Sequence, residues 1–199
     1  SSTRRASVGG PRSDRAPARA RIAVYMAAVQ AAALEAVAAE AQASDMIARI
    51  AHNVEREVGA VACRVIVARP DGEIVLRRDS LRLTGFLETP PQEIEGDPIV
   101  ACATDRRPVR NADLRQEKNW PHHAAQALAH GFTSCFIEPF VASDGEAGAI
   151  AIYGQSGAVD TAIIEELAMA TAEVLSRALR ISRRQERASA DAARFQSLS

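Results

Sequence analysis

The stretch from Ala127 to Tyr153 constrains the fold most, because it contains a helix end, two strands and the turn between them. Gly131 ends a helical pattern, since a helix C-cap commonly needs the positive φ that glycine adopts at little cost. An aromatic and β-branched run follows as far as Val141, and the segment 143–145 turns it back into a small apolar strand at 149–153. The stretch therefore predicts an antiparallel hairpin in the middle of a sheet.

Pro139 lies inside the first strand of this predicted hairpin. Proline donates no backbone hydrogen bond, so a fully paired strand interior would lose a ladder bond at this position. We therefore expect Pro139 to lie at a sheet edge, at a bulge or at a ligand-facing break in the ladder.

The rest of the chain alternates helical and extended patterns. We expect helices at 21–43, 44–59, 97–104, 122–130 and 159–194, and strands at 61–69, 73–78 and 108–113. Ser44 and Asp45 offer an N-cap for the second helix, and Asp97 followed by Pro98 signals the start of the third. The segment 81–95 has no clean period, which is typical of a long loop over one face of a sheet.

The N-terminal segment 1–20 is rich in Ser, Arg, Gly and Pro, and it has too few apolar residues to offset its ordering entropy. Residues 1–21 carry six Arg against Asp14 alone, a local charge of +5, while the net charge of the chain is −1. We interpret this basic end as a disordered linker and expect no nucleic-acid partner.

The apolar content also bears on the compartment. No uninterrupted apolar run reaches the roughly 18 residues that a membrane span needs. We see no signal peptide before the first helix. The three cysteines lie 39 and 33 residues apart, which is unlike a zinc knuckle and fits reduced thiols. We therefore expect a cytoplasmic protein with no membrane partner.

Several short pieces, in this order along the chain, resemble a GAF domain. They are Arg107-Pro108-Val109, Asp113, Trp120, Ala129-His130-Gly131-Phe132, Ser134-Cys135, Pro139, Asp144-Gly145 and the run from Ala149 to Tyr153. The subgroup they resemble most is found in bacterial sensor histidine kinases and cyclic-di-GMP turnover proteins. The resemblance covers roughly residues 34–179. It implies an α/β (α+β) fold with an antiparallel sheet of five to six strands, the terminal helices on one face and residues 81–130 over the other.

The resemblance also implies a division of the chain. We expect a linker at 1–20, a GAF domain including the N-terminal helix at 21–180, and a signalling helix at 181–199 that leads to an output domain of the same polypeptide. The implied function is a sensory or regulatory module that passes a signal through its terminal helices. The alternative is a structural dimerisation domain with a filled, ligand-free pocket.

A small-molecule ligand is expected between the sheet and residues 96–130, because this is the irregular, aromatic-containing cover in the sequence. The candidate ligand-binding residues are Asp113, Trp120, His123, Cys135 and Glu138. Three of them have a stated structural alternative: Asp113 can cap the following segment, Glu138 can face solvent from a strand, and Cys135 can be a small buried hydrophobe. The sequence does not identify a cofactor.

Catalytic and metal chemistry find little support. His52 lacks the residues that surround a histidine-kinase phospho-acceptor. His122 and His123 point about 100° apart on a helix, so they cannot both face one metal. Phe136 follows Cys135 where bilin attachment would favour a His, and the wide cysteine spacing does not resemble a methionine sulfoxide reductase. No phosphate loop or nucleophile elbow is present, so we expect no enzyme and no metal site.

The terminal helices predict a dimer. About 35 helical residues span roughly 50 Å, whereas a strand of six residues covers about 20 Å, so the helices outlast the sheet. We expect a homodimer through a bundle of the first and last helices, and a parallel pairing would place both C-terminal ends side by side. The alternative is that the N-terminal helix folds back on the C-terminal helix of its own chain.

Overall fold

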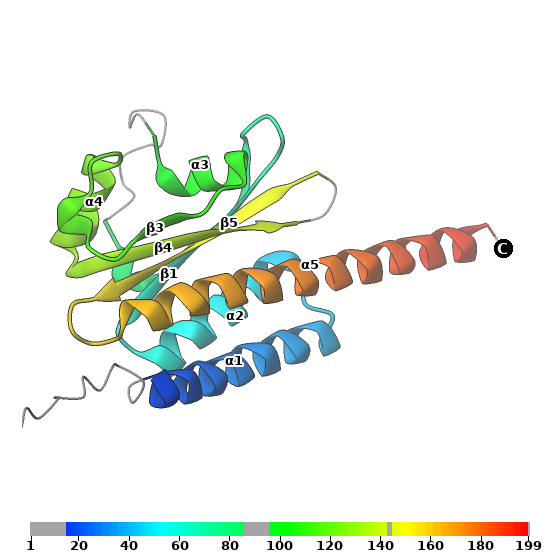
Figure 1. Cartoon of the computed structure of the whole chain (residues 1–199). Helices are drawn as coiled ribbons and strands as arrows, with labels where there is room; N and C mark the ends of the chain where they lie inside the picture. Colours follow the sequence, from blue (N-terminus) through cyan, green and yellow to red (C-terminus); the bar gives the residue numbers. More distant parts are fainter. Residues whose placement is uncertain (1–14, 86–95, 143–144, 199) are drawn as a thin grey trace, which may run out of the picture.

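A five-stranded antiparallel sheet forms the centre of the computed structural model, which describes residues 15–85, 96–142 and 145–198 (Figure 1). The strand order is β2-β1-β5-β4-β3. The strands are β1 (Val61–Ala68), β2 (Ile74–Asp79), β3 (Val109–Asn111), β4 (Phe132–Val141) and β5 (Ala147–Gln155). The sheet confirms the expected α+β class and the hairpin at its centre. The predicted turn residues 143–144 and residues 86–95 of the predicted loop lie outside the described ranges, and the described start of that loop holds η1 (Leu81–Leu83).

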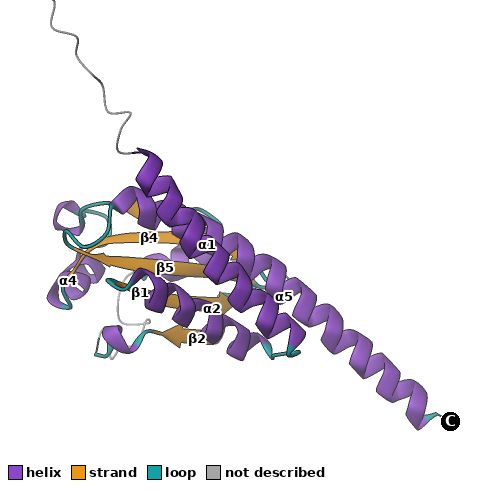
Figure 2. Cartoon of the chain, turned by 90° about the horizontal axis from the view of Figure 1, so that it is seen from below, coloured by secondary structure: helices purple, strands orange, loops and turns teal. Residues whose placement is uncertain are grey.

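Two long helices, α2 (Ala43–Val58) and α5 (Thr161–Ser197), cover one face of the sheet, and α1 (Arg15–Ala38) packs on their outer side (Figure 2). α2 is strongly amphipathic, and its buried residues recur at helical spacing. They pack with the β1 side chains Cys63, Val65 and Val67 and with Ile164 and Leu167 of α5 in one apolar core. We call this side of the sheet the helical face.

Shorter elements cover the opposite side, which we call the α3/α4 face: α3 (Pro98–Asp105), η2 (Leu114–Gln116) and α4 (Pro121–Ala129) (Figure 1). Asp97 caps α3 as predicted, because its carboxylate accepts a hydrogen bond of 3.0 Å from the Ile99 backbone N–H. Pro98 takes the first helical position, where its missing N–H costs nothing.

Pro139 lies at a sheet edge, which is one of the three positions expected from the sequence. It pairs with Ala149 of β5 on one side. On the other side β3 pairs only with Cys135, Phe136 and Ile137, so within the described residues no strand needs the hydrogen bond that Pro139 lacks.

The first two helices differ from the predicted boundaries. α1 begins at Arg15 rather than 21, so residues 15–20 of the predicted linker are helical. Pro17 does not prevent this, because the first N–H groups of a helix have no intrahelical partner anyway. α2 begins at Ala43 after the N-cap residue Gln42, which makes no side-chain capping bond, so Ser44 and Asp45 lie inside the first turn and do not cap it.

α1 also corrects the expectation about apolar segments. Over Ala16–Ala38 it is long and apolar enough, by length and composition, to cross a membrane, and only 17% of the 18-residue apolar window inside it is buried. Alanine raises the mean hydropathy there, although Arg19 and Arg21 interrupt the apolar run. Composition alone is weak support for a membrane span, because core helices of soluble proteins meet the same test.

α1 packs against α2 and α5 of its own chain. Gln185 of α5 donates to the Val37 carbonyl at 3.4 Å, and Ser182 donates to the Ala41 carbonyl at 3.2 Å. This is the contact that the fold-back alternative supposes. Beyond residue 185 the remaining residues of α5, 186–197, are exposed and extend past the end of α1 (Figure 1). The homodimer therefore stays a prediction.

Candidate ligand site

Arg64 is the most unusual residue on the α3/α4 face, because it is fully buried with 0% exposure. It is the one charged residue of β1, in which all eight residues are buried. Side chains alternate along a strand, so Arg64 lies on the same face as Ala62 and Ile66, which belong to the core under α3 and α4. A strand that is otherwise apolar thus places a guanidinium inside the domain.

Two carboxylates flank this guanidinium. Asp79 lies directly opposite Arg64 in the β1–β2 pairing, with its Oδ1 atom 3.2 Å from Arg64 Nε. The Oδ2 atom of Asp97, at the start of α3, lies 2.9 Å from Arg64 Nη1. Arg77 also contacts Asp79, at 2.7 Å. A buried charge is tolerated only when it is paired, so these acids explain how the fold accommodates Arg64.

The pairing of Arg64 balances charge but leaves hydrogen bonds unmade. None of its Nε, Nη1 and Nη2 atoms makes a well-aligned hydrogen bond to a described residue, although the Tyr153 hydroxyl lies close enough for Arg64 to oppose the rise that burial causes in the pKa of that tyrosine. The Asp79 Oδ1 atom also lacks an aligned donor among the described residues. The ion-pair distances to the two acids are short, yet the angles are poor. A buried donor without an acceptor costs about 1–3 kcal/mol, so an incoming acceptor atom would regain part of that energy.

His123 and Tyr153 add a neutral pair beside Arg64. The Nε2 atom of His123, from α4, lies 2.8 Å from the hydroxyl of Tyr153, from β5. Burial lowers the pKa of His123 to about 4, so the imidazole is neutral at pH 7. Burial raises the pKa of Tyr153 well above its ordinary value, and the nearby Arg64 opposes that rise. We call Arg64, Asp79, Asp97, His123 and Tyr153 the Arg64 cluster.

Two further predicted residues lie beside this cluster. Cys135 is buried and pairs with Tyr153 in the β4–β5 register. The Trp120 ring packs on Gly96, the residue before Asp97, so closely that a Cβ atom on Gly96 would lie 2.3 Å from Trp120 Cζ3. Gly96 also has a positive φ of 80°, so the chain needs glycine at this approach. The structure thus brings together His123, Cys135 and Trp120 among the five candidates.

The other two candidates are placed differently. Asp113 caps η2, and its carboxylate accepts hydrogen bonds from the Arg115 backbone and side chain, which lower the pKa of Asp113. This is its structural alternative. Glu138 corrects the predicted grouping, because the strand register turns it to the helical face, where Arg110 donates to it at 2.9 Å. The physical reason is that Glu138 lies an odd number of residues from Cys135, so the two point to opposite faces.

Sequence reasoning missed the roles of three residues at the centre of the site, namely Arg64, Asp97 and Tyr153. The sequence contained a usable signal for Arg64. Its strand is apolar on both faces, which indicates that both faces are covered, so a single Arg in it is expected to be buried. Tyr153 was recognised only as a strand residue, and Asp97 only as a helix cap. Their convergence on Arg64 depends on the strand order β1-β5, which the sequence does not show directly.

The cysteine thiols are poorly suited to covalent chemistry. Burial raises the pKa values of the thiols at Cys63, Cys102 and Cys135, that of Cys102 to about 12, so they are poor nucleophiles at pH 7. Cys63 also lies in the core of the helical face. Within the ranges that the structure describes, no group of three or more His, Cys, Asp or Glu residues could hold a metal ion. What the cluster offers is guanidinium donors and a hydroxyl–imidazole pair.

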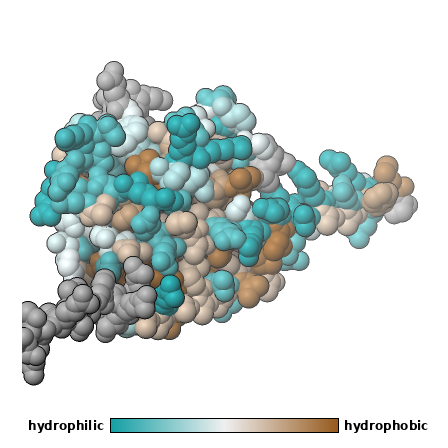
Figure 3. Space-filling view, in the orientation of Figure 1, coloured by the Kyte–Doolittle hydropathy of each residue, from teal (hydrophilic) through white to brown (hydrophobic). Residues whose placement is uncertain are grey.

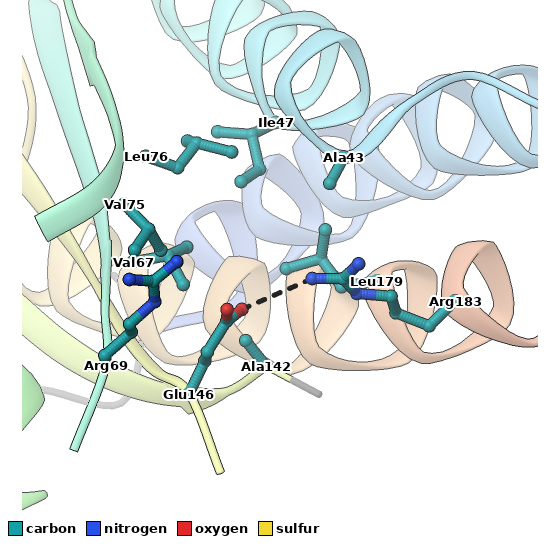
Figure 4. Close-up of a pocket in the computed structure, with 10 residues that line it drawn as sticks. All are labelled: Ala43, Ile47, Val67, Arg69, Val75, Leu76, Ala142, Glu146, Leu179 and Arg183. Atoms are coloured by element: carbon teal, nitrogen blue, oxygen red, sulfur yellow. Dashed lines mark ion pairs between the residues drawn. The ribbon is translucent and has the colours of Figure 1, made fainter. Parts of the chain in front are cut away.

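A cavity of about 260 Å³ lies elsewhere, on the helical face (Figure 4). Apolar side chains from α2, β1, β2 and α5 form most of its lining. Glu146 and Arg183 form an ion pair of 3.5 Å beside it. None of the five candidate residues lines this cavity, so the cavity does not test the predicted ligand position on the α3/α4 face. That position stays a prediction.

The fold is similar to solved structures of GAF domains. A phycoerythrobilin-bound GAF domain from a cyanobacterial phytochrome has a TM-score of 0.57 at 15% identity, over 81% of this chain and 97% of that chain. The free methionine-R-sulfoxide reductase of Neisseria meningitidis, in complex with its substrate, gives 0.56 at 14% identity, over 83% and 93%. The GAF domain of a phosphoenolpyruvate-protein phosphotransferase from Coxiella burnetii gives 0.52 at 14% identity, over 86% and 98%. At such identities the similarity shows the fold alone.

The family assignment comes from the sequence. A search of curated proteins found no match. The profile of the GAF domain matches residues 40–180, which is 141 of the 199 residues and runs from just before α2 into α5. The chain therefore belongs to the GAF domain family.

Proposed function

We propose that this GAF domain is a sensory and regulatory module that binds a small molecule at the Arg64 cluster and passes the change through α5 to an output domain. The observation that carries the proposal is the fully buried Arg64, whose guanidinium nitrogens lack aligned acceptors among the described residues. A ligand with carboxylate or carbonyl oxygens would supply those acceptors in a low-dielectric site.

The central strand β5 gives a direct route from the site to α5. Tyr153 belongs to the cluster, and the next residue, Gly154, faces the opposite side. There the backbone touches α5 closely, since a Cβ atom on Gly154 would lie 2.3 Å from Ile164 Cδ1. A shift of Tyr153 on ligand binding therefore moves a strand against which the first turns of α5 pack.

Arg110 gives a second link. It lies on β3 between the site elements α3 and η2, and its side chain crosses to the helical face. Its Nη2 atom lies 2.8 Å from Glu138 of β4, and its Nε atom lies 3.4 Å from Glu165 of α5. The wall of the site and the signalling helix thus share one charged contact.

The proposal includes the resemblance to GAF domains of bacterial sensor histidine kinases and cyclic-di-GMP turnover proteins. In such a protein the exposed end of α5, residues 186–198, would lead into the output domain of the same polypeptide. The domain would be cytoplasmic and non-enzymatic. The raised thiol pKa values support the non-enzymatic role, because they oppose a thiolate mechanism of the reductase kind.

A structural dimerisation domain without a ligand is the second candidate. One observation favours it: the side chains between the sheet and α3 and α4 are buried against one another. In this case the Arg64 cluster would serve only to fix the position of α3 on the sheet.

Native mass spectrometry separates the two functions. The chain is isolated from its source organism, and its mass is compared with the sequence mass while an absorption spectrum is recorded. We expect a retained small molecule, and we expect Tyr153→Phe to lose it because the site loses a hydroxyl. Tyr25→Phe is the matched control, since Tyr25 packs at the edge of the helical-face core and should leave retention unchanged.

Two results would contradict the sensory function. One is a wild-type chain that carries no added mass and no visible absorption at any growth condition tested. The other is a retained molecule that Tyr153→Phe and Tyr25→Phe hold equally well. Either result favours the ligand-free domain.

A further inference from the structure

α1 has two apolar faces, and the chain itself covers only one of them. The inner face packs on α2 and α5 and includes the buried residues Val29, Ala33 and Ala36. The opposite face is exposed and carries a second apolar row, which we call the outer seam. The outer seam consists of Ala20, Val24, Ala27, Ala31, Leu34 and Ala38.

The spacing of the outer seam is that of a helix–helix contact. Its members follow one another at intervals of four and three residues, the repeat of a coiled-coil seam. Val24 is 63% exposed and Leu34 is 69% exposed. The solvent face of a surface helix is ordinarily polar, so an apolar row of this length indicates a missing partner.

We propose that the partner is the α1 helix of a second copy of this chain, packed antiparallel across a two-fold axis. The outer seam is self-complementary in that direction, because its members are placed symmetrically about position 29. Pairing brings Ala20 against Ala38 of the second copy, Val24 against Leu34, and Ala27 against Ala31. The two larger side chains meet each other, and the central alanines allow close approach of the helices.

The charges flanking the outer seam favour the same direction. Arg19 and Arg21 lie near the N-terminal end of α1, and Glu35 and Glu40 lie near its C-terminal end. Antiparallel pairing brings the arginines of one copy toward the glutamates of the other and opposes the helix dipoles favourably. Parallel pairing would bring the two arginine pairs together.

The surface is open to such a partner. Figure 2 looks at the molecule from below and shows α1 in front of α2 and α5. Apolar surface also follows the lower edge of the molecule in Figure 3, where α1 lies. α5 runs in the same direction as α1, so the two exposed α5 ends would leave an antiparallel dimer in opposite directions (Figure 1). This differs from the side-by-side arrangement considered from the sequence.

The first test is the mass of the full chain by light scattering over a dilution series. We expect a dimer at tens of micromolar for the wild type. Leu34→Glu and Val24→Glu should each weaken the dimer by at least about tenfold, because they place a charge in an apolar contact. Leu81→Glu is the matched control, since Leu81 is 91% exposed in η1 and away from α1. Circular dichroism checks that all variants keep their helix content.

The second test is the direction of pairing, by disulfide cross-linking. Two chains are prepared, one with Ala20→Cys and one with Ala38→Cys; the native cysteines are buried. We expect the mixture to form a covalent dimer and each chain alone to form none, because like positions in an antiparallel pair lie about 27 Å apart. Charge reversal adds a second check: Arg21→Glu should weaken the dimer, and Glu35→Arg in the same chain should restore it.

Three results would overturn the proposal. A wild-type chain that stays monomeric at tens of micromolar has no such interface. Cross-linking of Ala38→Cys with itself, but not with Ala20→Cys, shows parallel pairing. A monomeric chain that sediments with phosphatidylglycerol vesicles, and that loses this binding on Leu34→Glu, shows that the outer seam meets lipid instead of a second copy.

Discussion

The two faces of the sheet are built from the same strands but differ in the polar and charged groups that they bury. On β1, Cys63 and Val65 point into the core of the helical face, while Arg64 between them points under α3 and α4. The helical face buries a continuous apolar core, and its buried polar atoms without partners are confined to Asn53 and Thr171 among the described residues. The α3/α4 face also has an apolar core, but it buries the guanidinium of Arg64 inside it. The α3/α4 face therefore carries the fully buried cation that a ligand can use.

Removing the buried cation of the α3/α4 face should cause the largest loss of stability. Arg64→Met leaves Asp97 and Asp79 without their shared partner, and breaking a buried ion pair from one side costs about 3–5 kcal/mol. We expect a loss of about 4 kcal/mol in the free energy of unfolding, measured by urea denaturation. Arg77→Met is the control, because Arg77 binds the same Asp79 but is 30% exposed, and it should cost less than about 1 kcal/mol. Equal losses for the two variants would show that the burial of Arg64 has no special weight.

Truncation in the helical face tests the other half of the comparison. Leu167 of α5 is fully buried in that core, so Leu167→Ala should reduce the free energy of unfolding by about 3 kcal/mol through lost burial and the cavity left behind. Met169 lies two residues further along the same helix and is 47% exposed. Met169→Ala should therefore change stability by less than about 0.5 kcal/mol. A loss of unfolding free energy below about 1 kcal/mol for Leu167→Ala would contradict a well-packed core at this position.

The α3/α4 face should also make stability depend on pH, with a size of about 3 kcal/mol. The pKa of His123 is about 4 in the folded chain, below the ordinary 6.5, because the imidazole is buried. Between these values the unfolded chain binds a proton that the folded chain does not bind. Stability should therefore fall as pH decreases from about 6.5 to about 4 and stop falling on this account below that.

Urea denaturation at several pH values measures this dependence. His123→Gln should remove the part of the pH dependence of the unfolding free energy that His123 contributes. This part lies between about pH 4, the pKa of His123 in the folded chain, and about pH 6.5, its ordinary pKa. His52 is exposed on α2, so His52→Gln should keep the full slope. If the two variants have the same slope as the wild type, His123 is not the group responsible.

The comparison also shows what the sequence could predict. The hairpin formed by β4 and β5 and the capped start of α3 depend on local rules of turns and caps, and they were predicted correctly. The edge position of Pro139 was one of three alternatives that the properties of proline left open. The start of α1 was missed because the propensity of alanine outweighs the presence of Pro17 near the helix end. These errors affect boundaries and leave the architecture unchanged.

The candidate site was harder to predict, because it forms between elements that are far apart in the chain. Arg64, Asp97 and Tyr153 meet only when β1 pairs with β5 and α3 packs across both strands. Glu138 was assigned to the wrong face because the parity of β4 was not followed from Cys135. Strand order and parity are tertiary information. Local patterns therefore identified His123 and the neighbouring Trp120 and Cys135, but they did not identify Arg64 as the centre of the cluster.

The smallest predicted effect concerns the point where the two faces meet. Tyr153 lies in the Arg64 cluster, and Gly154 beside it faces α5, where an added Cβ atom would lie 2.3 Å from Ile164 Cδ1 and 2.6 Å from Ser134 Oγ. Gly154→Ala should cost about 1 kcal/mol in unfolding free energy, because the end of the Ile164 side chain has to move.

A double-mutant cycle sharpens this last prediction. Ile164→Val removes the atom that the new methyl group would meet, so Gly154→Ala should cost less in that background than in the wild type. Ile163 is also buried in α5 but is absent from the close contacts of Gly154, so in an Ile163→Val background the cost should be unchanged. If the two backgrounds give the same cost, the strand and the helix are not in direct steric contact at Gly154, and the route from Tyr153 to α5 loses its first step.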